Sequence, residues 1–237
     1  MTELDNKEKI EELKDKGLKI IQARDSYRFS VDSILLVNFI RVKNYEKIID
    51  LGSGSGIIPL LLAGKKRGLS IYGVEIQEEL ANMARRSVEL NNLTEQIVII
   101  QEDLKNLRSI FKNSQFDVVV SNPPYVSLGQ GKISPLRSRA VARHEISCDL
   151  EDILSVSNYL LKDKGRIYLI YKSAKLIKVI TTFKKYDLEP KVIKFVHPRP
   201  GEEANLVLLE GIKEGKEGLK VEPPLFLKDD PLRRDIK

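Results

Sequence analysis

Asn122-Pro123-Pro124-Tyr125 is the stretch whose residue types most clearly suit a chemical step. It directly follows an apolar, strand-like run at 116–121. The two prolines fix φ and lack a backbone N–H, so the main chain there offers carbonyl acceptors. With the Asn amide oxygen as a further acceptor and the Tyr ring as a stacking face, the tetrapeptide could hold a planar amino group beside a methyl donor. Asn-Pro-Pro is also an ordinary turn, so both interpretations stay open at this point.

Other polar segments that follow predicted strands suit the parts of a nucleoside ligand. Asp50 ends one strand, and the glycine-rich turn at 52–56 lets a ligand approach the backbone closely. Glu75 ends the next strand, where it could accept hydrogen bonds from a ribose diol. Asp103 and Leu104 follow the third strand and suit the amino group and flat face of an adenine. The predicted cofactor-binding residues of these segments are Asp50, Gly52, Ser53, Gly54, Gly56, Glu75, Ile76, Asp103, Leu104 and Asn122.

The glycine-rich turn departs from two known fingerprints, and these departures narrow the choice of ligand. A dinucleotide site needs Gly-x-Gly-x-x-Gly, but position 57 is Ile57 here, and the Gly-Lys-Ser/Thr of a P-loop is missing from the turn. Asp50 would repel a pyrophosphate and would tolerate a cationic ligand such as a sulfonium amino acid. Because four such signals occur in order, each at a strand end, the sequence predicts S-adenosyl-L-methionine as the cofactor.

Apolar strands alternate with helical stretches along most of the chain. This pattern indicates a parallel sheet that is covered on both faces. The segment 197–201 between the last two strands is too short for a crossover helix, so these strands should pair antiparallel. We therefore predict an α/β fold: a doubly wound, mostly parallel, seven-stranded Rossmann-like sheet with a C-terminal antiparallel hairpin. The predicted strands are Lys47–Leu51, Ser70–Glu75, Ile97–Gln101, Phe116–Ser121, Arg166–Tyr171, Lys191–Val196 and Asn205–Leu209, and the predicted helices lie near 57–67, 77–92, 104–112, 150–162 and 174–185.

The segments at the two ends of the chain are expected to differ from this pattern. The N-terminal one should hold a surface helix at 5–16, where charges alternate, a short strand at 17–22, and a helix from Asp32 to about Val42 that covers the cofactor. From about Gly211 the chain is charged and contains proline, which favours a tail on the surface. The predicted boundaries are 1–43 for the N-terminal extension, 44–213 for the catalytic domain and 214–237 for the tail.

Composition limits the partners and the compartment. The chain has 40 Lys and Arg against 34 Asp and Glu, a net charge of +6, which is compatible with a phosphate-rich partner and equally with ordinary solvated charge. Cys148 is the single cysteine, and the two histidines are His144 and His197, so we expect no metal site. No apolar run is long enough to span a membrane, and the N-terminus is unlike a signal peptide. We expect a cytoplasmic protein.

The segment Val126–Asp149 is long for a loop of a compact domain, which suggests a function. It is rich in basic residues and follows the Asn-Pro-Pro-Tyr tetrapeptide, so it could contact substrate phosphates, although scattered surface charge is the alternative. Within it, His144 is better explained by a loop hydrogen bond than by a role as general base. Arg199, in the later turn, is a second candidate phosphate contact. The candidate substrate-binding residues are Tyr125, Lys132, Arg137, Arg139, Arg143, His144 and Arg199.

Motifs inside and outside the core carry a resemblance to a known family. The strand-end motifs resemble the class I S-adenosylmethionine-dependent methyltransferases, in their Asn-Pro-Pro-Tyr branch. Tyr27–Leu36, Ala142-Arg143-His144-Glu145, His197–Asn205 and Pro223-Pro224-Leu225 are similar to bacterial enzymes that methylate N6 of adenine 37 in a valine tRNA. The resemblance spans about residues 17–227. The core motifs specify only a methyltransferase, whereas the flanking motifs point to the tRNA family.

The resemblance implies roles for individual residues. Asn122 and the Pro123 carbonyl would bind the exocyclic amine, Tyr125 would stack on the target base, and Pro124 completes the catalytic set. Asp32 lies in the segment that contacts the methionine end of the cofactor in this branch, with a helix N-cap as the alternative. Asp103 could likewise only cap the following helix. The implied partner is tRNA.

The Asn-Pro-Pro-Tyr motif also serves other substrates, which remain as alternatives. They are guanine N2 in ribosomal RNA, glutamine in a protein, and adenine in DNA. A DNA methylase normally needs extra sequence-reading structure, and a release-factor glutamine methylase needs an N-terminal helical domain that about 25 residues cannot supply. An anticodon-loop adenine is already unpaired, so its extrusion costs little. A non-catalytic RNA-binding module on the same fold is a further alternative, which the intact Asn122-Pro123-Pro124-Tyr125 argues against.

Overall fold

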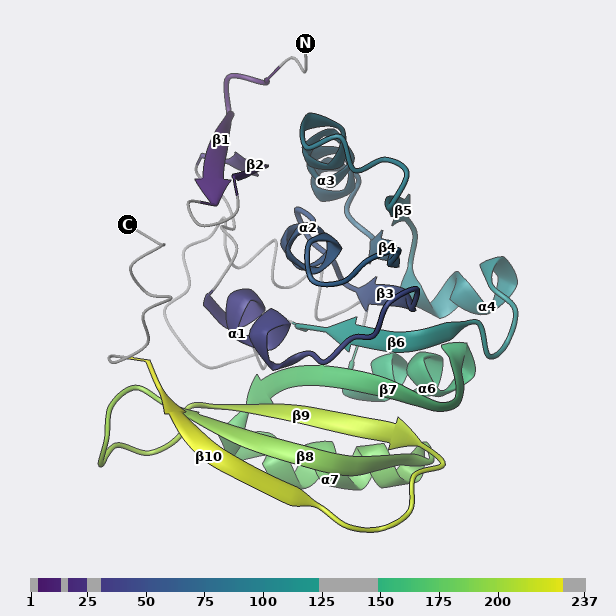
Figure 1. Ribbon diagram of the computed structural model, residues 1–237, viewed down its shortest axis with the longest axis vertical. Coiled ribbons are helices and arrows are strands. Elements are labelled where there is room, and N and C mark those ends of the chain that lie inside the picture. The colour runs from purple at the N-terminus through teal and green to yellow at the C-terminus, as the bar shows by residue number, and fades with distance from the viewer. Residues whose placement is uncertain (1–3, 14–16, 25–30, 124–148, 228–237) are drawn as a thin grey trace.

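The protein is described by a computed structural model that covers residues 4–13, 17–24, 31–123 and 149–227 (Figure 1). Within these residues one sheet has eight strands in the order β10-β8-β9-β7-β6-β3-β4-β5, and β1 and β2 form a separate two-stranded sheet. The strands are β1 (Glu8–Leu13), β2 (Leu18–Ala23), β3 (Lys47–Leu51), β4 (Ser70–Glu75), β5 (Ile97–Gln101), β6 (Phe116–Ser121), β7 (Leu161–Lys172), β8 (Leu188–His197), β9 (Leu206–Lys213) and β10 (Lys220–Phe226). The helices are α1 (Val31–Phe39), α2 (Ile57–Ala63), α3 (Glu78–Leu90), η1 (Leu104–Asn106), α4 (Leu107–Ile110), α6 (Leu150–Leu160), η2 (Ser173–Lys175) and α7 (Leu176–Lys185).

The large sheet confirms the predicted mostly parallel fold. Strands β5, β4, β3, β6 and β7 run parallel, and β9 lies antiparallel to both β7 and β8. The central strand β6 is the clearest case, because Val118, Val119 and Val120 are all completely buried. A strand covered on both faces has no polar side, so its sequence is continuously apolar. Four predicted strands, β3 to β6, have the bounds that the sequence predicts.

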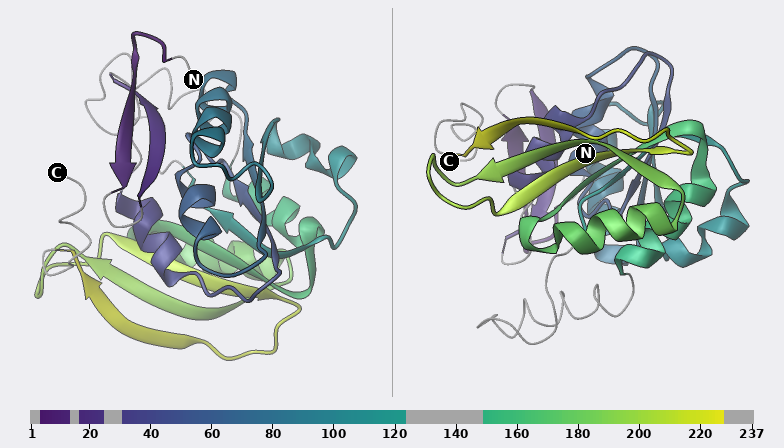
Figure 2. Two further views of the ribbon diagram at one scale, coloured as in Figure 1. Left: turned by 45° about the horizontal axis from the view of Figure 1, so that its top comes forward. Right: turned by 90° about the horizontal axis from the view of Figure 1, so that it is seen from below.

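Helices cover the two faces of the sheet, and the core consists of two clusters, one on each face (Figure 2). Side chains of α1, α2 and α3 pack in one cluster, and those of α4, α6 and α7 pack in the other. Residues 104–112, predicted as one helix, form η1 followed by α4, and the predicted helices at 57–67 and at Asp32 to Val42 end earlier, at Ala63 and Phe39.

The prediction of a surface helix at 5–16 is wrong, because Glu8–Leu13 forms strand β1. β1 pairs antiparallel with β2 along its whole length, and the hairpin docks on α3. Glu8 forms a bidentate ion pair with Arg86 of α3, and the Asn91 side chain bonds both the N–H and the C=O of Lys19, at 2.9 and 2.6 Å. These long-range contacts satisfy backbone groups that a short, isolated helix leaves to water, so they override the local charge spacing.

The predicted surface tail is wrong in part, because Lys220–Phe226 forms strand β10. It pairs parallel with β8 and extends the predicted seven strands by an eighth at the edge of the sheet. The register shifts between Glu222 and Leu225, so Pro223 and Pro224 lie in a bulge of an edge strand. Proline lacks the N–H of a ladder and is tolerated there. The two prolines therefore weaken the pairing of β10 with β8 less than the sequence pattern alone suggests.

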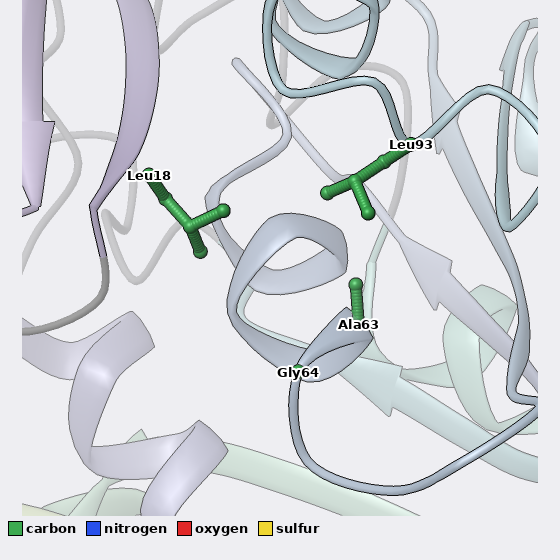
Figure 3. Close-up of a pocket in the computed structure, with 4 residues that line it drawn as sticks. All are labelled: Leu18, Ala63, Gly64 and Leu93. Carbon is green, nitrogen blue, oxygen red and sulfur yellow. The ribbon is translucent and has the colours of Figure 1, made fainter.

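An apolar pocket of about 360 Å³ opens between the hairpin and the helices (Figure 3). Leu18, Ala63, Gly64 and Leu93 line it. Because α2 ends at Ala63 and β5 begins after Leu93, the pocket lies at the amino-terminal edge of the parallel strands. None of the predicted site residues lines it.

Two lysine side chains, of which Lys213 is buried and Lys65 half-buried, donate to carbonyls at the carboxyl ends of helices. Lys213 is 7% exposed, and its Nζ donates to the carbonyls of Asn158 and Leu161, both at 2.9 Å. Lys65 donates in the same way to the carbonyls of Val37 and Ile40 after α1. The last carbonyls of a helix have no partner within it and carry the negative end of its dipole, so an ammonium group stabilises them.

We expect Lys213→Met to lower the free energy of unfolding by about 1–3 kcal/mol, because it leaves two buried carbonyls without a donor while keeping the apolar stem. Urea unfolding measures the change. Lys178→Met, at an exposed position of α7, is the control and should change stability by less than about 0.5 kcal/mol. Equal stability of Lys213→Met and the unsubstituted protein would show that these hydrogen bonds do not stabilise the fold.

Candidate active site

The parallel strands bring four of the predicted segments to one edge of the sheet (Figure 1). β6, β3, β4 and β5 are neighbours in that order, so their carboxyl ends lie side by side. Leu51 is opposite Ser121 on one side and Val74 on the other, and Glu75 is opposite Gln101. The structure thus brings together the segments that carry Asp50, Glu75, Asp103 and Asn122, which lie far apart in the sequence. Ligands of open α/β sheets bind at this edge.

The glycine-rich turn after β3 folds over the end of β4. The N–H groups of Gly52 and Ser53 both donate to the carbonyl of Val74, at 2.9 and 2.8 Å. Gly52 and Gly54 have φ of +78° and +56°, a conformation that strains other residues, and a Cβ on either would meet nothing within 4 Å. Their backbone therefore faces open space that a ligand can occupy.

The third glycine of the turn has a different role. Gly56 has φ of +86°, and a Cβ there would lie 3.0 Å from the Cβ of Ala84 in α3. It allows α2 to begin directly after the turn and α3 to pack closely against it.

Asp50 is the most unusual residue of the site. It is completely buried, and within the part of the chain that the structure describes neither of its carboxylate oxygens has a hydrogen-bond partner. Burial, reinforced by the negative charge of Glu75, raises the pKa of Asp50 well above its usual value. The hydroxyl of Ser53, 4% exposed, also lacks a partner there. A cationic group beside these atoms would satisfy both the charge and the hydrogen-bonding capacity.

Glu75 is buried too, at 1% exposed, but its carboxylate is held in place by the backbone. Oε2 accepts from the N–H of Gly54 and Oε1 from the N–H of Gln77, both at 2.9 Å. A carboxylate oxygen can accept more than one hydrogen bond, so these contacts fix the orientation and leave capacity for hydroxyl donors. The next residue, Ile76, is half-buried beside it.

Asp103 has the capping role that the sequence left open. Its Oδ1 accepts from the N–H of Lys105 at 2.9 Å and caps η1. Leu104 directly after it is 9% exposed. The cap leaves Oδ2 of Asp103 with no partner among the described residues, so a contact to a ligand is compatible with the cap.

Asn122 ends the row of segments, and a residue that the sequence did not single out contacts it. The Asn122 Nδ2 donates to Oγ of Ser33 in α1 at 3.0 Å, and the preceding Ser121 donates to the carbonyl of Leu51 at 2.9 Å. Ser33 is 89 positions away, and no local pattern marks such a contact. Asp32, next to it, lies in the first turn of α1 rather than before the helix, so it is not the N-cap of α1. An acidic side chain in the first turn interacts favourably with the positive end of the helix dipole.

The remaining predicted site residues fall into two groups. Arg199 is 61% exposed in the turn after β8, at the same edge of the sheet, and lies 3.6 Å from Glu202. Pro123 is buried. Outside the described residues lie Pro124, Tyr125, Lys132, Arg137, Arg139, Arg143 and His144.

Two features are absent from the described residues. No three His, Cys, Asp or Glu side chains within them are grouped so that they could hold a metal ion. No helix among them is long and apolar enough to cross a membrane.

Comparisons with known proteins agree with the geometry. A family model described as "Methyltransferase small domain" matches residues 27–195. The tRNA1(Val) (adenine(37)-N6)-methyltransferase of Aeromonas hydrophila is 32% identical over 187 residues, which cover 78% of this chain and 77% of that protein. The protein of the same name from Porphyromonas gingivalis ATCC 33277 is 31% identical over 167 residues, 70% of this chain and 65% of its own length.

Solved structures share the fold at lower sequence identity. A predicted O-methyltransferase from Agrobacterium tumefaciens has a TM-score of 0.67 and 24% identity, over 83% of this chain and 87% of that one. Geranyl diphosphate C-methyltransferase from Streptomyces coelicolor, in complex with S-adenosyl-L-homocysteine, has a TM-score of 0.57 and 13% identity, over 77% of each chain. These likenesses establish the fold of the chain as that of class I methyltransferases.

We expect Asp50→Asn to stabilise the ligand-free protein at pH 8 by about 1–3 kcal/mol, because it removes a carboxyl group whose ionisation burial disfavours and whose oxygens have no hydrogen-bond partner among the described residues. The folded-state pKa of Asp50 is raised, so its contribution to stability is present at low pH and is lost as pH rises through that pKa. The gain from the substitution should therefore shrink as pH falls toward the ordinary Asp pKa of about 3.9.

Urea unfolding at several pH values between 4 and 8 measures this difference. Asp163→Asn, at an exposed position, is the matched control and should follow the pH dependence of the unsubstituted protein. If Asp50→Asn destabilised the protein at pH 8, the carboxylate would have a stabilising partner that contradicts its isolation.

Proposed function

Because the chain belongs to the methyltransferase small domain family, and within it to the family of the tRNA1(Val) (adenine(37)-N6)-methyltransferases, we propose that it methylates the exocyclic N6 of an anticodon-loop adenine in tRNA, adenine 37 of a valine tRNA. S-adenosyl-L-methionine is the methyl donor. The observation that carries the proposal is the row of Asp50, Glu75 and Asn122 along one sheet edge: a carboxylate that needs a cation, a carboxylate anchored for hydroxyls, and an amide at the end of β6.

The residues of the cofactor half fit the donor chemistry. S-adenosyl-L-methionine supplies the methyl group on a positively charged sulfur, which leaves as a neutral thioether. Asp50 and Ser53 would face cationic and polar parts of the methionine portion, since their side-chain oxygens have no hydrogen-bond partner among the described residues. Glu75 would accept from the ribose hydroxyls, and Asp103 with Leu104 would bind the adenine. The open backbone of the glycine-rich turn leaves the room that such a ligand needs.

The residues that would bind the adenine amino group compensate for its low reactivity as a nucleophile. The lone pair on the exocyclic nitrogen is delocalised into the adenine ring. Acceptors on both N–H bonds, the Asn122 Oδ1 and the Pro123 carbonyl, would favour a pyramidal nitrogen whose lone pair points at the methyl group. In this alignment Asn122 and Pro123 would hold the nitrogen in line with the donor, which would give up the methyl group and keep the electrons of the C–S bond on sulfur. The product ammonium is acidic and loses its proton to water, so no strong base is required.

The substrate contacts would come from basic residues of the segment that follows Pro124 in the sequence and from Arg199. We assign stacking on the target base to Tyr125, which lies outside the described residues. The phosphate contacts would come from the basic loop and the turn after β8, whose contacts position an RNA rather than read its sequence. The proposed phosphate contacts are Lys132, Arg137, Arg139, Arg143 and Arg199, and His144 is a further candidate substrate-binding residue of the same basic segment.

The test of the function follows the methyl group. Tritium transfer from labelled S-adenosyl-L-methionine is measured into separate tRNA, ribosomal RNA and protein fractions, and the modified nucleoside is identified by mass spectrometry. N6-methyladenosine at position 37 of one tRNA is the expected product. Label only in ribosomal RNA guanine or in protein glutamine would keep the fold and the chemistry and overturn the substrate. Cofactor binding without label in any fraction would overturn the proposal in favour of a binding module.

We expect Asn122→Ala to lower kcat about a hundredfold or more and to leave the Kd of S-adenosyl-L-methionine within about twofold, because the amide acts on the acceptor. Isothermal titration calorimetry and single-turnover transfer to tRNA separate the two effects. Asn38→Ala, at an exposed position of α1, is the control and should match the unsubstituted enzyme in both. Transfer by Asn122→Ala within a few fold of the normal rate would remove Asn122 from the catalytic set.

A further inference from the structure

The hydrogen bond between Ser33 and Asn122 joins helix α1 to the end of the central strand β6. Asn122 follows β6 at the end of the central sheet, and Ser33 lies in the first turn of α1, which covers one face. The Asn122 Nδ2 is the donor and the Ser33 Oγ the acceptor, 3.0 Å apart. Ser33 is 5% exposed, so bulk water competes poorly for this bond.

The chemistry of the amide makes its orientation decisive. The two ends of an asparagine amide have nearly the same size, but only Oδ1 accepts a hydrogen bond and only Nδ2 donates. An amino group that is to be methylated donates both of its hydrogens. If the Asn122 amide were rotated by half a turn about its Cβ–Cγ bond, it would present Nδ2 to that amino group. Two donors would then face each other, and no hydrogen bond could form.

We propose that Ser33 is a positioning residue for this orientation: its hydroxyl oxygen accepts from Nδ2, and in that arrangement Oδ1 is the amide atom that can accept from the substrate amine. The proposal rests on the proposed function, since it needs an amino group as acceptor of the methyl. Ser33 itself contacts neither the substrate nor the reacting atoms. It acts through Asn122.

The two partners are each fixed by separate contacts, which gives the hydrogen bond a defined geometry. On one side, Ser121 is buried and donates to the carbonyl of Leu51, and the buried Pro123 restricts the backbone after Asn122. On the other side, Leu35 and Leu36, which follow Ser33 in α1, are 2% and 0% exposed and pack in the core. A side chain held from a packed element keeps its rotamer, as precise positioning requires.

The position of Ser33 also gives α1 a role on both sides of the reaction. Asp32, the preceding residue in the same turn, is the predicted contact to the methionine end of the cofactor. Consecutive residues of α1 would thus position the donor and the acceptor amide. The substitution tests below separate the two, because Ser33→Ala leaves Asp32 unchanged.

The test compares Ser33→Ala in two backgrounds. In the otherwise unsubstituted enzyme we expect kcat to fall about tenfold, with the KM of tRNA and of S-adenosyl-L-methionine within about twofold, because only the transition-state contact is lost. In an Asn122→Asp background either carboxylate oxygen can face the amine, so orientation no longer matters. There the same Ser33→Ala substitution should change kcat by less than about twofold.

Two further variants control for packing. Ser33→Thr keeps the hydroxyl and should retain most of the activity. Ser157→Ala removes another buried hydroxyl, which donates to the Ile153 carbonyl in α6 at 2.6 Å, and should leave kcat unchanged. An unchanged kcat in Ser33→Ala would overturn the proposal. An equal loss from Ser33→Ala in both backgrounds would also overturn it, in favour of a packing role.

The hydrogen bond between Ser33 and Asn122 can be measured without substrate, and therefore independently of the proposed function. The side-chain amide signals of Asn122, assigned by their absence in Asn122→Asp, are followed by hydrogen exchange in nitrogen-15 NMR. We expect one Nδ2 proton to exchange slowly in the unsubstituted protein and rapidly in Ser33→Ala. Equal exchange in both would disprove the hydrogen bond. Failure of the function itself shows separately, as the absence of N6-methyladenosine with the unsubstituted enzyme, and the kinetic comparison is then made on the amino group that takes the label.

Discussion

A buried carboxylate that has no hydrogen-bond partner among the described residues is the constraint around which the site is arranged. Asp50 lies on β3, between β4 and β6, where the apolar side chains of the central sheet exclude water. An unsatisfied buried polar group costs about 1–3 kcal/mol, and a charge costs more. The glycine-rich turn beside it keeps the backbone open, so a ligand with a positive charge can approach it.

The two buried carboxylates of the site differ in how they are satisfied, and this difference divides the ligand between them. Glu75 takes one backbone N–H on each oxygen and is held in a fixed orientation. Asp50 takes none among the described residues. A fixed, partly satisfied carboxylate suits neutral hydroxyl donors, whereas an unsatisfied one suits a cation. A cofactor that joins a ribose to a cationic sulfonium amino acid matches both demands within one molecule.

The sequence predicts best those elements whose pattern depends on burial alone. Strands β3 to β6 are apolar throughout and end in polar residues, so their bounds and the chemistry at their ends can be read together. β1 and β10 could not be found in this way, because each depends on partners that its own residues do not indicate: β2 and α3 for the charged β1, and the edge of β8 for the proline-containing β10. The same reason hides Ser33, whose partner Asn122 is 89 positions away.

The contacts of the site connect its segments in a ring, from the glycine-rich turn through α2 and α1 to Asn122 and back. Such a ring can place side chains from distant segments with the accuracy that methyl transfer needs. The glycine-rich turn begins α2, α2 packs against α1 in one core cluster, and α1 carries Ser33. Ser33 bonds Asn122, and the adjoining Ser121 bonds the carbonyl of Leu51, which leads back into the glycine-rich turn. Because protein interiors are close-packed, this set of contacts fixes the glycine-rich turn and the Asn122 amide relative to each other before any ligand binds.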